Sequence, residues 1–416
     1  MWGFYMATEN LEKGTLQINV INEQNEPVSG ARVQIFITGG TNAEIDNFTT
    51  DASGQSAVLE LAAPPKELSL EKFNDIRPYS EYTAVVNADG YEQSDVAGIE
   101  ILAGTNSTIN ILLHPVTPTA NSTDILIPEH TLYGDYPPKI PEISIKPINA
   151  GGEIVLSRVV IPETIIVHDG VPGDTTATDY YVPYTDYIKN VASSEIYATW
   201  PEATIRANVL AIMSFTLNRV FTEWYRGKGY NFTITSSTAY DQKWIYGRNI
   251  YDSISVIVDE MFENYISKPD VKQPILTQYC DGRRTTCPGG LSQWGSLDLG
   301  ESGYTPIEIL RKYYGETVYI NTAEQIEGIP SSWPGYNLTE GSRGEKVRQV
   351  QEQLDRISMT YSAIPRVAID GIYGTGTAEA VRKFQEIFGL GVSGVIDYRT
   401  WYKISQIYVG LTKIAE

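Results

Sequence analysis

Apolar residues alternate with polar ones through the first part of this 416-residue chain. This period of two restricts the region to β-strands, because successive side chains of a strand point to opposite faces of a sheet. Turn sequences such as Asn25-Glu26-Pro27 and Ala88-Asp89-Gly90 separate the runs. The apolar positions are Leu16, Ile18 and Val20, then Val33, Ile35 and Ile37, then Val58 and Leu61, and finally Ile109, Ile111 and Leu113. We therefore predict a small all-β sandwich over residues 1–115.

The turns of this region carry a family resemblance. The spacing of Pro27–Val33, Thr50–Gly54 and Ala88–Tyr91 resembles the carboxypeptidase regulatory-like, transthyretin-like sandwich. That resemblance implies an accessory domain without catalytic residues of its own.

Two segments of the chain read as connectors. Residues 116–143 contain Pro118, Pro128, Pro137, Pro138 and Pro141 among Thr, Asn and Ser. This composition favours an extended, semi-rigid linker that a protease can reach. Residues 326–336 form a second linker, rich in Gly, Pro and Ser. The predicted domains are therefore 1–115, 144–325 and 337–416.

The charge of the chain excludes one class of partner. The formal net charge is −20 and the sequence pI is about 4.6, whereas nucleic-acid binding needs Lys and Arg to neutralise phosphates. No apolar run approaches the ~18 to 20 residues that span a bilayer. Residues 1–14 have no apolar core of a secretory signal. We expect no nucleic-acid partner, no membrane span, and synthesis without a secretory signal.

The central region mixes strand and helix patterns. The segment 201–224 begins with a proline suited to a first helical turn. Apolar residues from Ile254 to Tyr265 recur at spacings of three and four, which predicts an amphipathic helix. Thr305, Pro306 and Glu308 predict a capped helix that runs to Tyr314. Because β-branched runs precede these helices, the expected class is α+β.

Two blocks of this region resemble the stage II sporulation protein D family of lytic transglycosylases. The first block consists of Tyr187, Ile188, Val191, Ser194, Glu195, Trp200, Pro201, Arg206, Ala207 and Ala211. The second consists of Gly290-Leu291-Ser292-Gln293-Trp294-Gly295, followed by Gly303-Tyr304, Ile307, Ile309-Leu310 and Tyr313-Tyr314. The resemblance implies that Glu195 is the catalytic residue. The expected substrate-binding residues are Ser194, Trp200, Ser292, Gln293 and Trp294.

A glutamate suits the chemistry that this resemblance implies. A glycosidic oxygen must receive a proton as the bond breaks, and burial can keep a carboxylic acid protonated near neutral pH. Ile196, Tyr197 and Trp200 flank Glu195. A glycoside hydrolase usually needs a second carboxylate. By the mechanism of the family, a lytic transglycosylase needs only one, because the same glutamate then takes a proton from the C6 hydroxyl of the sugar, giving a 1,6-anhydro end.

The chain departs from the family pattern at a few positions. Met213 replaces the usual Arg of the long helix, and Cys287 lies near the place of a usual His. Some relatives bind zinc through His and Cys, but the matching histidines are missing here, so we predict no metal and no cofactor. Cys280 and Cys287 either close a small disulfide loop beside the active site or remain free.

The last domain carries the strongest resemblance of the chain, to the peptidoglycan-binding domain type 1, a three-helix module. Val347, Val350 and Leu354 form one apolar helix stripe, and Ala380, Val381 and Phe384 form another. The matching residues are Leu338, Gly341–Gly344, Val347, Val350-Gln351, Leu354, Asp370–Gly374, Thr377, Ala380-Val381, Phe384-Gln385, Gly389-Leu390, Gly394, Asp397 and Thr400-Trp401. The resemblance implies that peptidoglycan strands are a partner.

The order of the domains resembles the clostridial spore cortex-lytic enzymes. That resemblance implies a zymogen that cleaves the MurNAc–GlcNAc bond of cortex peptidoglycan during germination, with the N-terminal part as its pro-region. It also implies a subtilisin-like germination protease as activating partner, which cuts within the connector 116–143, and a location in the spore cortex and coat region. Two alternatives stay open. One is a non-catalytic spore-coat or cell-wall binding protein. The other is a two-carboxylate muramidase in which Asp241 or Asp281 assists Glu195.

Overall fold

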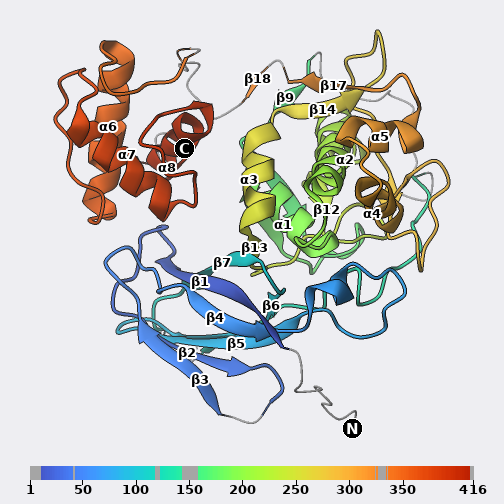
Figure 1. The fold of residues 1–416 in the computed structure, drawn as a ribbon, viewed down its shortest axis with the longest axis horizontal. Helices are drawn as coiled ribbons and strands as arrows, with labels where there is room; N and C mark the ends of the chain where they lie inside the picture. Colours follow the sequence, from blue (N-terminus) through green and yellow to red (C-terminus); the bar gives the residue numbers. More distant parts are fainter. Residues whose placement is uncertain are drawn as a thin grey trace.

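The N-terminal strands form two stacked sheets around one apolar core (Figure 1). The structure is a computed structural model that describes residues 11–40, 43–117, 122–142, 158–323, 325–326, 334 and 336–412. One sheet has the order β13 (Ile250–Tyr251), β7 (Asn106–Leu113), β1 (Glu12–Asn22) and β4 (Leu59–Ala63). The other has the order β3 (Glu44–Thr49), β2 (Arg32–Ile37), β5 (Ser80–Asn87), β6 (Gln93–Ile101) and β8 (Ser122–Leu126). A 3₁₀ turn at Lys66–Ser69 follows β4.

The predicted alternation agrees with the burial of these strands. Leu16, Ile18 and Val20 of β1 are fully buried, and the side chains between them are partly exposed. Val58 differs from the prediction, because it precedes β4 and is 61% exposed. The strand β13 comes from the central domain and pairs antiparallel with β7, Ile250 opposite Thr108. One sheet therefore runs from the N-terminal region into the next domain.

The segment that was expected to be an extended connector is a strand followed by a packed loop. Residues 122–126 form β8, which pairs in parallel with β6 and completes the second sheet. Farther along, Ile127, His130, Leu132 and Tyr136 are buried. The prolines still prevent a helix, but these apolar and aromatic side chains hold the loop against the central domain.

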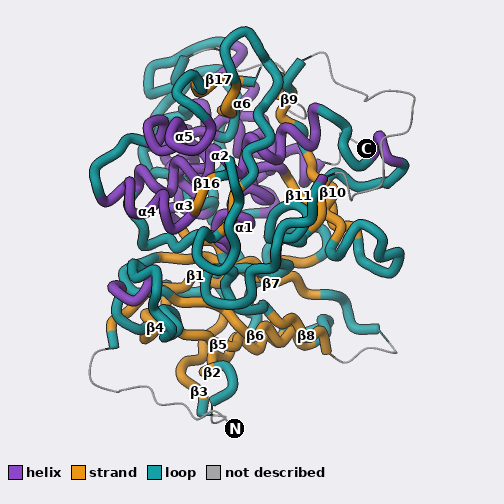
Figure 2. The backbone as a smooth tube through the Cα atoms, turned by 90° about the vertical axis from the view of Figure 1, so that its right-hand side faces the viewer, coloured by secondary structure: helices purple, strands orange, loops and turns teal. Residues whose placement is uncertain are grey.

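The central domain surrounds a long buried helix with further helices, a three-stranded sheet and short strand pairs (Figure 2). The helices are α1 (Tyr184–Glu195), α2 (Glu202–Phe221), α3 (Asp252–Met261), α4 (Gln293–Glu301) and α5 (Pro306–Tyr314), with a 3₁₀ turn at Arg226–Lys228. The strands are β9 (Val160–Ile161), β10 (Thr164–His168), β11 (Asp179–Pro183), β12 (Ile234–Thr235), β14 (Asn264–Ser267), β15 (Tyr279–Cys280), β16 (Leu291–Ser292), β17 (Tyr319–Thr322) and β18 (Gln325–Ile326). Buried residues cover nearly all faces of α2, so this helix is the centre of the core.

Of two helices predicted in this domain, one begins as predicted and the other ends earlier than predicted. The capping box of Thr305 and Glu308 is present at the start of α5, with Pro306 in its first turn. By contrast, α3 ends at Met261, before the predicted end at Tyr265. The residues after it form β14, which pairs antiparallel with β17, Tyr265 opposite Asn321. Phe262 and Tyr265 are buried either way, so their apolar spacing did not distinguish helix from strand.

The C-terminal domain consists of α6 (Glu345–Thr360), α7 (Thr375–Ile387) and α8 (Tyr398–Thr412) around their own core. Val347, Val350 and Leu354 are buried as predicted, and α7 is followed by Gly389 in a left-handed conformation. A β-rich N-terminal region, an α+β middle and a helical C-terminal domain are therefore confirmed. Among the described residues, no helix is both long and apolar enough to cross a membrane.

Candidate active site

Helix α1 places Glu195 at its last position, deep in the central domain. The neighbouring loop 242–245 is bound along this helix: the Tyr187 hydroxyl donates to Gln242 Oε1 over 3.0 Å. Asn190 donates to the Ile245 carbonyl and accepts from the Ile245 N–H. The helix ends here because Ile196 is extended. These contacts bring the main-chain N–H of Lys243 to the Glu195 carboxyl.

The Glu195 carboxyl is fully buried and sits among polar groups. Its Oε1 accepts a hydrogen bond of 2.6 Å from the Lys243 N–H, and its Oε2 accepts a long one of 3.5 Å from Gln293 Nε2. The Tyr279 hydroxyl also lies near enough to lower the pKa of the acid. That hydroxyl forms no hydrogen bond of regular geometry with any residue that the structure describes.

Burial sets the proton affinity of this acid. Desolvation raises the pKa of Glu195 from 4.5 to about 7, against the opposing effects of the Lys139 ammonium, the Tyr279 hydroxyl and the Lys243 N–H. A group with this pKa holds a proton part of the time at neutral pH. It can therefore give a proton and take one back without an extreme change of pH.

The second predicted block meets the first, but only one of its three predicted binding side chains reaches Glu195. Gln293, the first residue of α4, contacts the acid, and its Oε1 has no partner among the described residues. Ser292 is the N-cap of α4, where its Oγ accepts from the Gly295 N–H over 2.9 Å. Its local role is therefore a helix cap, which sequence spacing did not reveal.

The two predicted binding tryptophans and Ser194 lie in the core. Trp294 is 2% exposed and its ring centroid is 5.2 Å from that of Trp200. The Trp200 Nε1 donates to the Ser69 carbonyl of the N-terminal region over 3.0 Å. Ser194 is fully buried, and its Oγ has no partner within the described ranges. Neither indole presents an open face to a sugar in this structure.

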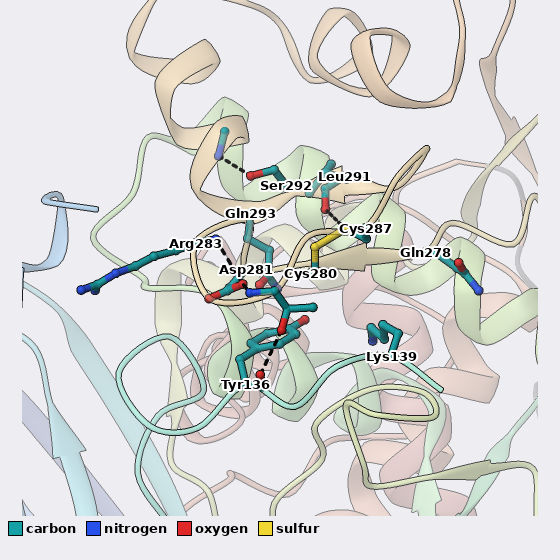
Figure 3. The surroundings of a disulfide bond; sticks show 12 residues. Tyr136, Lys139, Gln278, Cys280, Asp281, Arg283, Cys287, Leu291, Ser292 and Gln293 are labelled. Carbon is teal, nitrogen blue, oxygen red and sulfur yellow. Dashed lines mark hydrogen bonds between the residues drawn. A yellow bond between two sulfur atoms is a disulfide. The ribbon is translucent and has the colours of Figure 1, made fainter. Parts of the chain in front are cut away.

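A disulfide loop fixes the elements beside the acid (Figure 3). Cys280 and Cys287 are bonded, which decides between the two alternatives for these thiols. Strands β15 and β16 pair in parallel, with Tyr279 opposite Leu291 and Cys280 opposite Ser292. The loop thereby holds Tyr279 and Gln293 on adjoining segments, both directed toward Glu195.

The two carboxylates considered as partners of Glu195 are engaged elsewhere. Asp241 accepts from Arg219 Nε over 2.8 Å and from the Tyr225 hydroxyl over 2.6 Å. Asp281 accepts from main-chain N–H groups of the disulfide loop, including that of Thr285 over 2.9 Å. Neither oxygen pair is available to activate a water molecule. Within the part of the chain that the structure describes, no three His, Cys, Asp or Glu side chains gather into a metal site.

Residues of the connector complete the surroundings of the acid, and sequence reasoning missed them. Tyr136 is buried, its hydroxyl has no partner in the described ranges, and its pKa is raised well above the usual value by burial and then by Glu195. Lys139 donates from Nζ to the Asp241 carbonyl over 3.0 Å, and its charge lowers the pKa of Glu195. The signal for them was a run of aromatic and aliphatic residues inside a Pro-rich segment.

Comparisons with known proteins concern the C-terminal domain first. Residues 343–404 match the family model described as "Putative peptidoglycan binding domain". A zinc D-Ala-D-Ala carboxypeptidase of Streptomyces albus G is 40% identical over 76 residues, which are 18% of this chain and 28% of that relative. The chain thus spans just over a quarter of the length of this curated relative. The similarity of the helical domain to peptidoglycan-binding domains supports a cell-wall-associated protein.

Two solved structures are also similar to parts of the chain. The crystal structure of the SleB N-terminal domain is 32% identical, has a TM-score of 0.16, and covers 18% of this chain and 93% of its own. The Bacillus anthracis TIE protein is 22% identical, has a TM-score of 0.18, and covers 25% of this chain and 17% of its own.

Proposed function

We propose that this chain is a peptidoglycan lytic transglycosylase that cuts the MurNAc–GlcNAc bond of spore cortex glycan. Glu195 is the general acid and base, and the C-terminal domain holds the polymer. In this proposal the chain is a zymogen that a subtilisin-like germination protease activates, and its place is the spore cortex and coat region. The resemblance of the two sequence blocks and of the domain order supports the proposal.

One observation carries the proposal more than any other. Glu195 is fully buried with a pKa raised to about 7, in hydrogen-bond contact with Lys243 and with Gln293 of the second sequence block. Perturbed carboxylic acids of this kind are typical of acid–base catalysts. The engagement of Asp241 and Asp281 favours a reaction that needs a single carboxylic acid over a two-carboxylate hydrolysis.

The reaction balances without water. The protonated Glu195 gives its proton to the oxygen that links C1 of muramic acid to the next sugar, and this C–O bond breaks. The C6 hydroxyl of the same muramic acid then bonds to C1, and the Glu195 carboxylate takes its proton. The products are a new hydroxyl end and a 1,6-anhydromuramic end, and the acid regains its starting state.

In the test, a sequence-specific protease site replaces residues 148–153 of the full chain. The protein is assayed before and after it is cut at this site. Purified cortex peptidoglycan is the substrate, and mass spectrometry identifies the products. Anhydromuramic ends, one water lighter than reducing ends, are expected from the cut protein. Reducing ends would mean hydrolysis, and an intact polymer that sediments with the protein would mean a binding protein only.

The decisive variant is Glu195→Gln in the same cut protein. Removing a general acid is expected to lower the cleavage rate about 10²- to 10⁴-fold, while sedimentation with the polymer stays unchanged. Glu301→Gln, at an exposed position at the end of α4, is the matched control. Retained activity in Glu195→Gln would overturn the role of this residue.

A further inference from the structure

Residues 128–142 lie across the surroundings of Glu195 as one continuous layer, which we call the strap. Arg284 donates to the carbonyls of Leu132 and Tyr133, and the Thr285 hydroxyl donates to the Tyr136 carbonyl over 3.0 Å. At the other end, the Ile140 N–H donates to the Ala239 carbonyl over 2.7 Å. The strap is thus bound through its main chain to the disulfide loop on one side and to the 239–243 loop on the other.

The strap also fills the space beside the acid with two side chains. Figure 3 shows Tyr136 next to Asp281 and Gln293, with Lys139 on the same side of the disulfide. Lys139 Nζ is 5.4 Å from the centre of the Tyr279 ring and donates to the Asp241 carbonyl. An aromatic ring and a cation of the strap therefore lie beside the Glu195 carboxyl.

The last residue of the strap, Glu142, binds the buried guanidinium of Arg219. Arg219 donates from both terminal nitrogens to the Glu142 carboxylate, over 3.0 and 2.7 Å, and from Nε to Asp241. The Arg219 side chain is fully buried, whereas that of Glu142 is 25% exposed. A cavity of about 200 Å³ borders Arg219 and is also lined by Trp224 and Phe232. The two terminal nitrogens of Arg219 are therefore bound by a partly exposed residue of the strap.

Glu142 is not needed to neutralise Arg219. Asp241 is fully buried and already pairs with Arg219 through Nε, so the two charges cancel when Glu142 leaves. Withdrawal of the strap would leave a neutral buried pair with two free N–H groups in the fork geometry that matches a carboxylate. Lys139 of the strap interacts electrostatically with both Glu195 and Arg219, so the fork and the acid lie around the same strap residue.

We propose that the strap occupies the substrate groove in place of a glycan, and that the Arg219 fork is a subsite for a carboxylate of the glycan's side groups, held by Glu142 until the strap withdraws. The inference rests on the proposed function for the identity of the polymer. The carboxylate belongs either to the lactyl group of muramic acid or to the attached peptide.

The first test loosens the strap in the intact chain. Glu142→Gln keeps the shape of the side chain but removes a charge-assisted bidentate contact, so opening is expected to increase about tenfold. In the Glu195→Gln background, the rate of trypsin cleavage after Lys139 should also rise about tenfold, because trypsin cuts only the fraction of molecules in which the strap is open. With Glu195 present, the cleavage of cortex glycan by the uncut chain should rise equally. Glu129→Gln, an exposed carboxylate of the same strap, should change neither rate.

The second test addresses the subsite in the cut protein. Glycan whose carboxylates have been converted to neutral amides should show a KM raised about tenfold, with kcat little changed. Arg219→Lys keeps the charge but loses the fork, so it should shrink this preference; its thermal unfolding reports whether it is folded. Glycan stripped of peptides by an amidase identifies the source, because the amidase removes the peptide carboxylates and frees the lactyl carboxylates to which the peptides were attached. A lowered or unchanged KM assigns the lactyl group, and a raised KM assigns the peptide.

The outcomes separate this inference from the proposed function. Equal trypsin rates for Glu142→Gln and the parent would overturn the strap, and equal KM values for acidic and amidated glycan would overturn the subsite. If no form of the protein cuts glycan, but Glu142→Gln still speeds trypsin cleavage, the catalytic proposal fails and the strap stands.

Discussion

The N-terminal sheets and the C-terminal helices both contact the central domain, but through different kinds of surface. On the N-terminal side, Glu100 and Arg248 form an ion pair whose side chains are fully buried, and the Asn249 side chain bonds both main-chain groups of Glu100. On the C-terminal side, Arg399 meets Glu260 at 3.5 Å with both side chains partly exposed. One contact excludes water from charges, and the other does not.

This difference indicates that the N-terminal region is part of the fold of the catalytic domain. Tyr79 and Leu102 belong to the core of the central domain, while Ile245 belongs to the core of the sheets. Removing the sheets would leave Arg248 without its partner and expose both cores. The C-terminal helices add the aromatic contact of Phe262 with Tyr402, whose ring centroids are 4.6 Å apart. Like the sheets, they have a core of their own, and Tyr402 belongs to the core of the central domain, but no fully buried ion pair joins them to that domain among the described residues.

The largest expected effect comes from breaking the buried pair. Arg248→Met leaves Glu100 without a counter-charge in a dry interface, so the free energy of unfolding should fall by about 3–5 kcal/mol. Denaturant unfolding near neutral pH measures this loss. The double variant Glu100→Leu with Arg248→Met removes both charges and should recover more than half of it. A single-variant loss below about 1 kcal/mol would remove the contrast between the two contacts.

An intermediate effect should appear at Glu195, beside which Tyr136 and Lys139 of the strap lie. Its pKa is about 7 in the folded protein and 4.5 in an unfolded chain. The folded state therefore binds the proton more tightly, and the stability that Glu195 contributes is present below pH 4.5 and is lost as pH rises through 7. Glu195→Gln stays neutral throughout. It should match the parent near pH 4.5 and exceed it by about 1–3 kcal/mol at pH 8.

Thermal unfolding of the two proteins across this pH range provides the measurement. Glu100, with a pKa also raised to about 7 by burial, titrates in both and cancels in the difference. A difference that is constant with pH would contradict a buried, proton-holding Glu195.

The parts of the fold that could be predicted were those where side-chain burial follows a simple period. Leu16, Ile18 and Val20 alternate because one face of β1 is covered, and Val347, Val350 and Leu354 recur because one face of α6 is covered. The end of α3 was missed because Phe262 and Tyr265 are buried in a turn and a strand at spacings that also suit a helix.

The groups around the catalytic acid could be predicted where they are side chains, but not where they belong to the main chain. Glu195 and Gln293 belong to the two recognised blocks, whereas the Lys243 N–H is a donor that every residue but proline possesses. Trp294 was expected to meet a sugar, but its size makes it equally suited to the core, where it packs on Trp200. The strap was predicted to be a linker because its sequence is rich in proline. Composition alone does not show that Leu132 and Tyr136 are buried against the central domain.

The smallest expected effect lies on the C-terminal side. Arg399→Ala removes a partly exposed ion pair, so the free energy of unfolding should fall by only about 0.2–1 kcal/mol. The difference from the parent protein should vanish in ~1 M salt, where the Debye length is about 3 Å. Sedimentation with peptidoglycan should not change, because the core of the helical domain is separate. A loss above about 2 kcal/mol would mean that these helices, like the N-terminal sheets, are bound into the fold of the central domain.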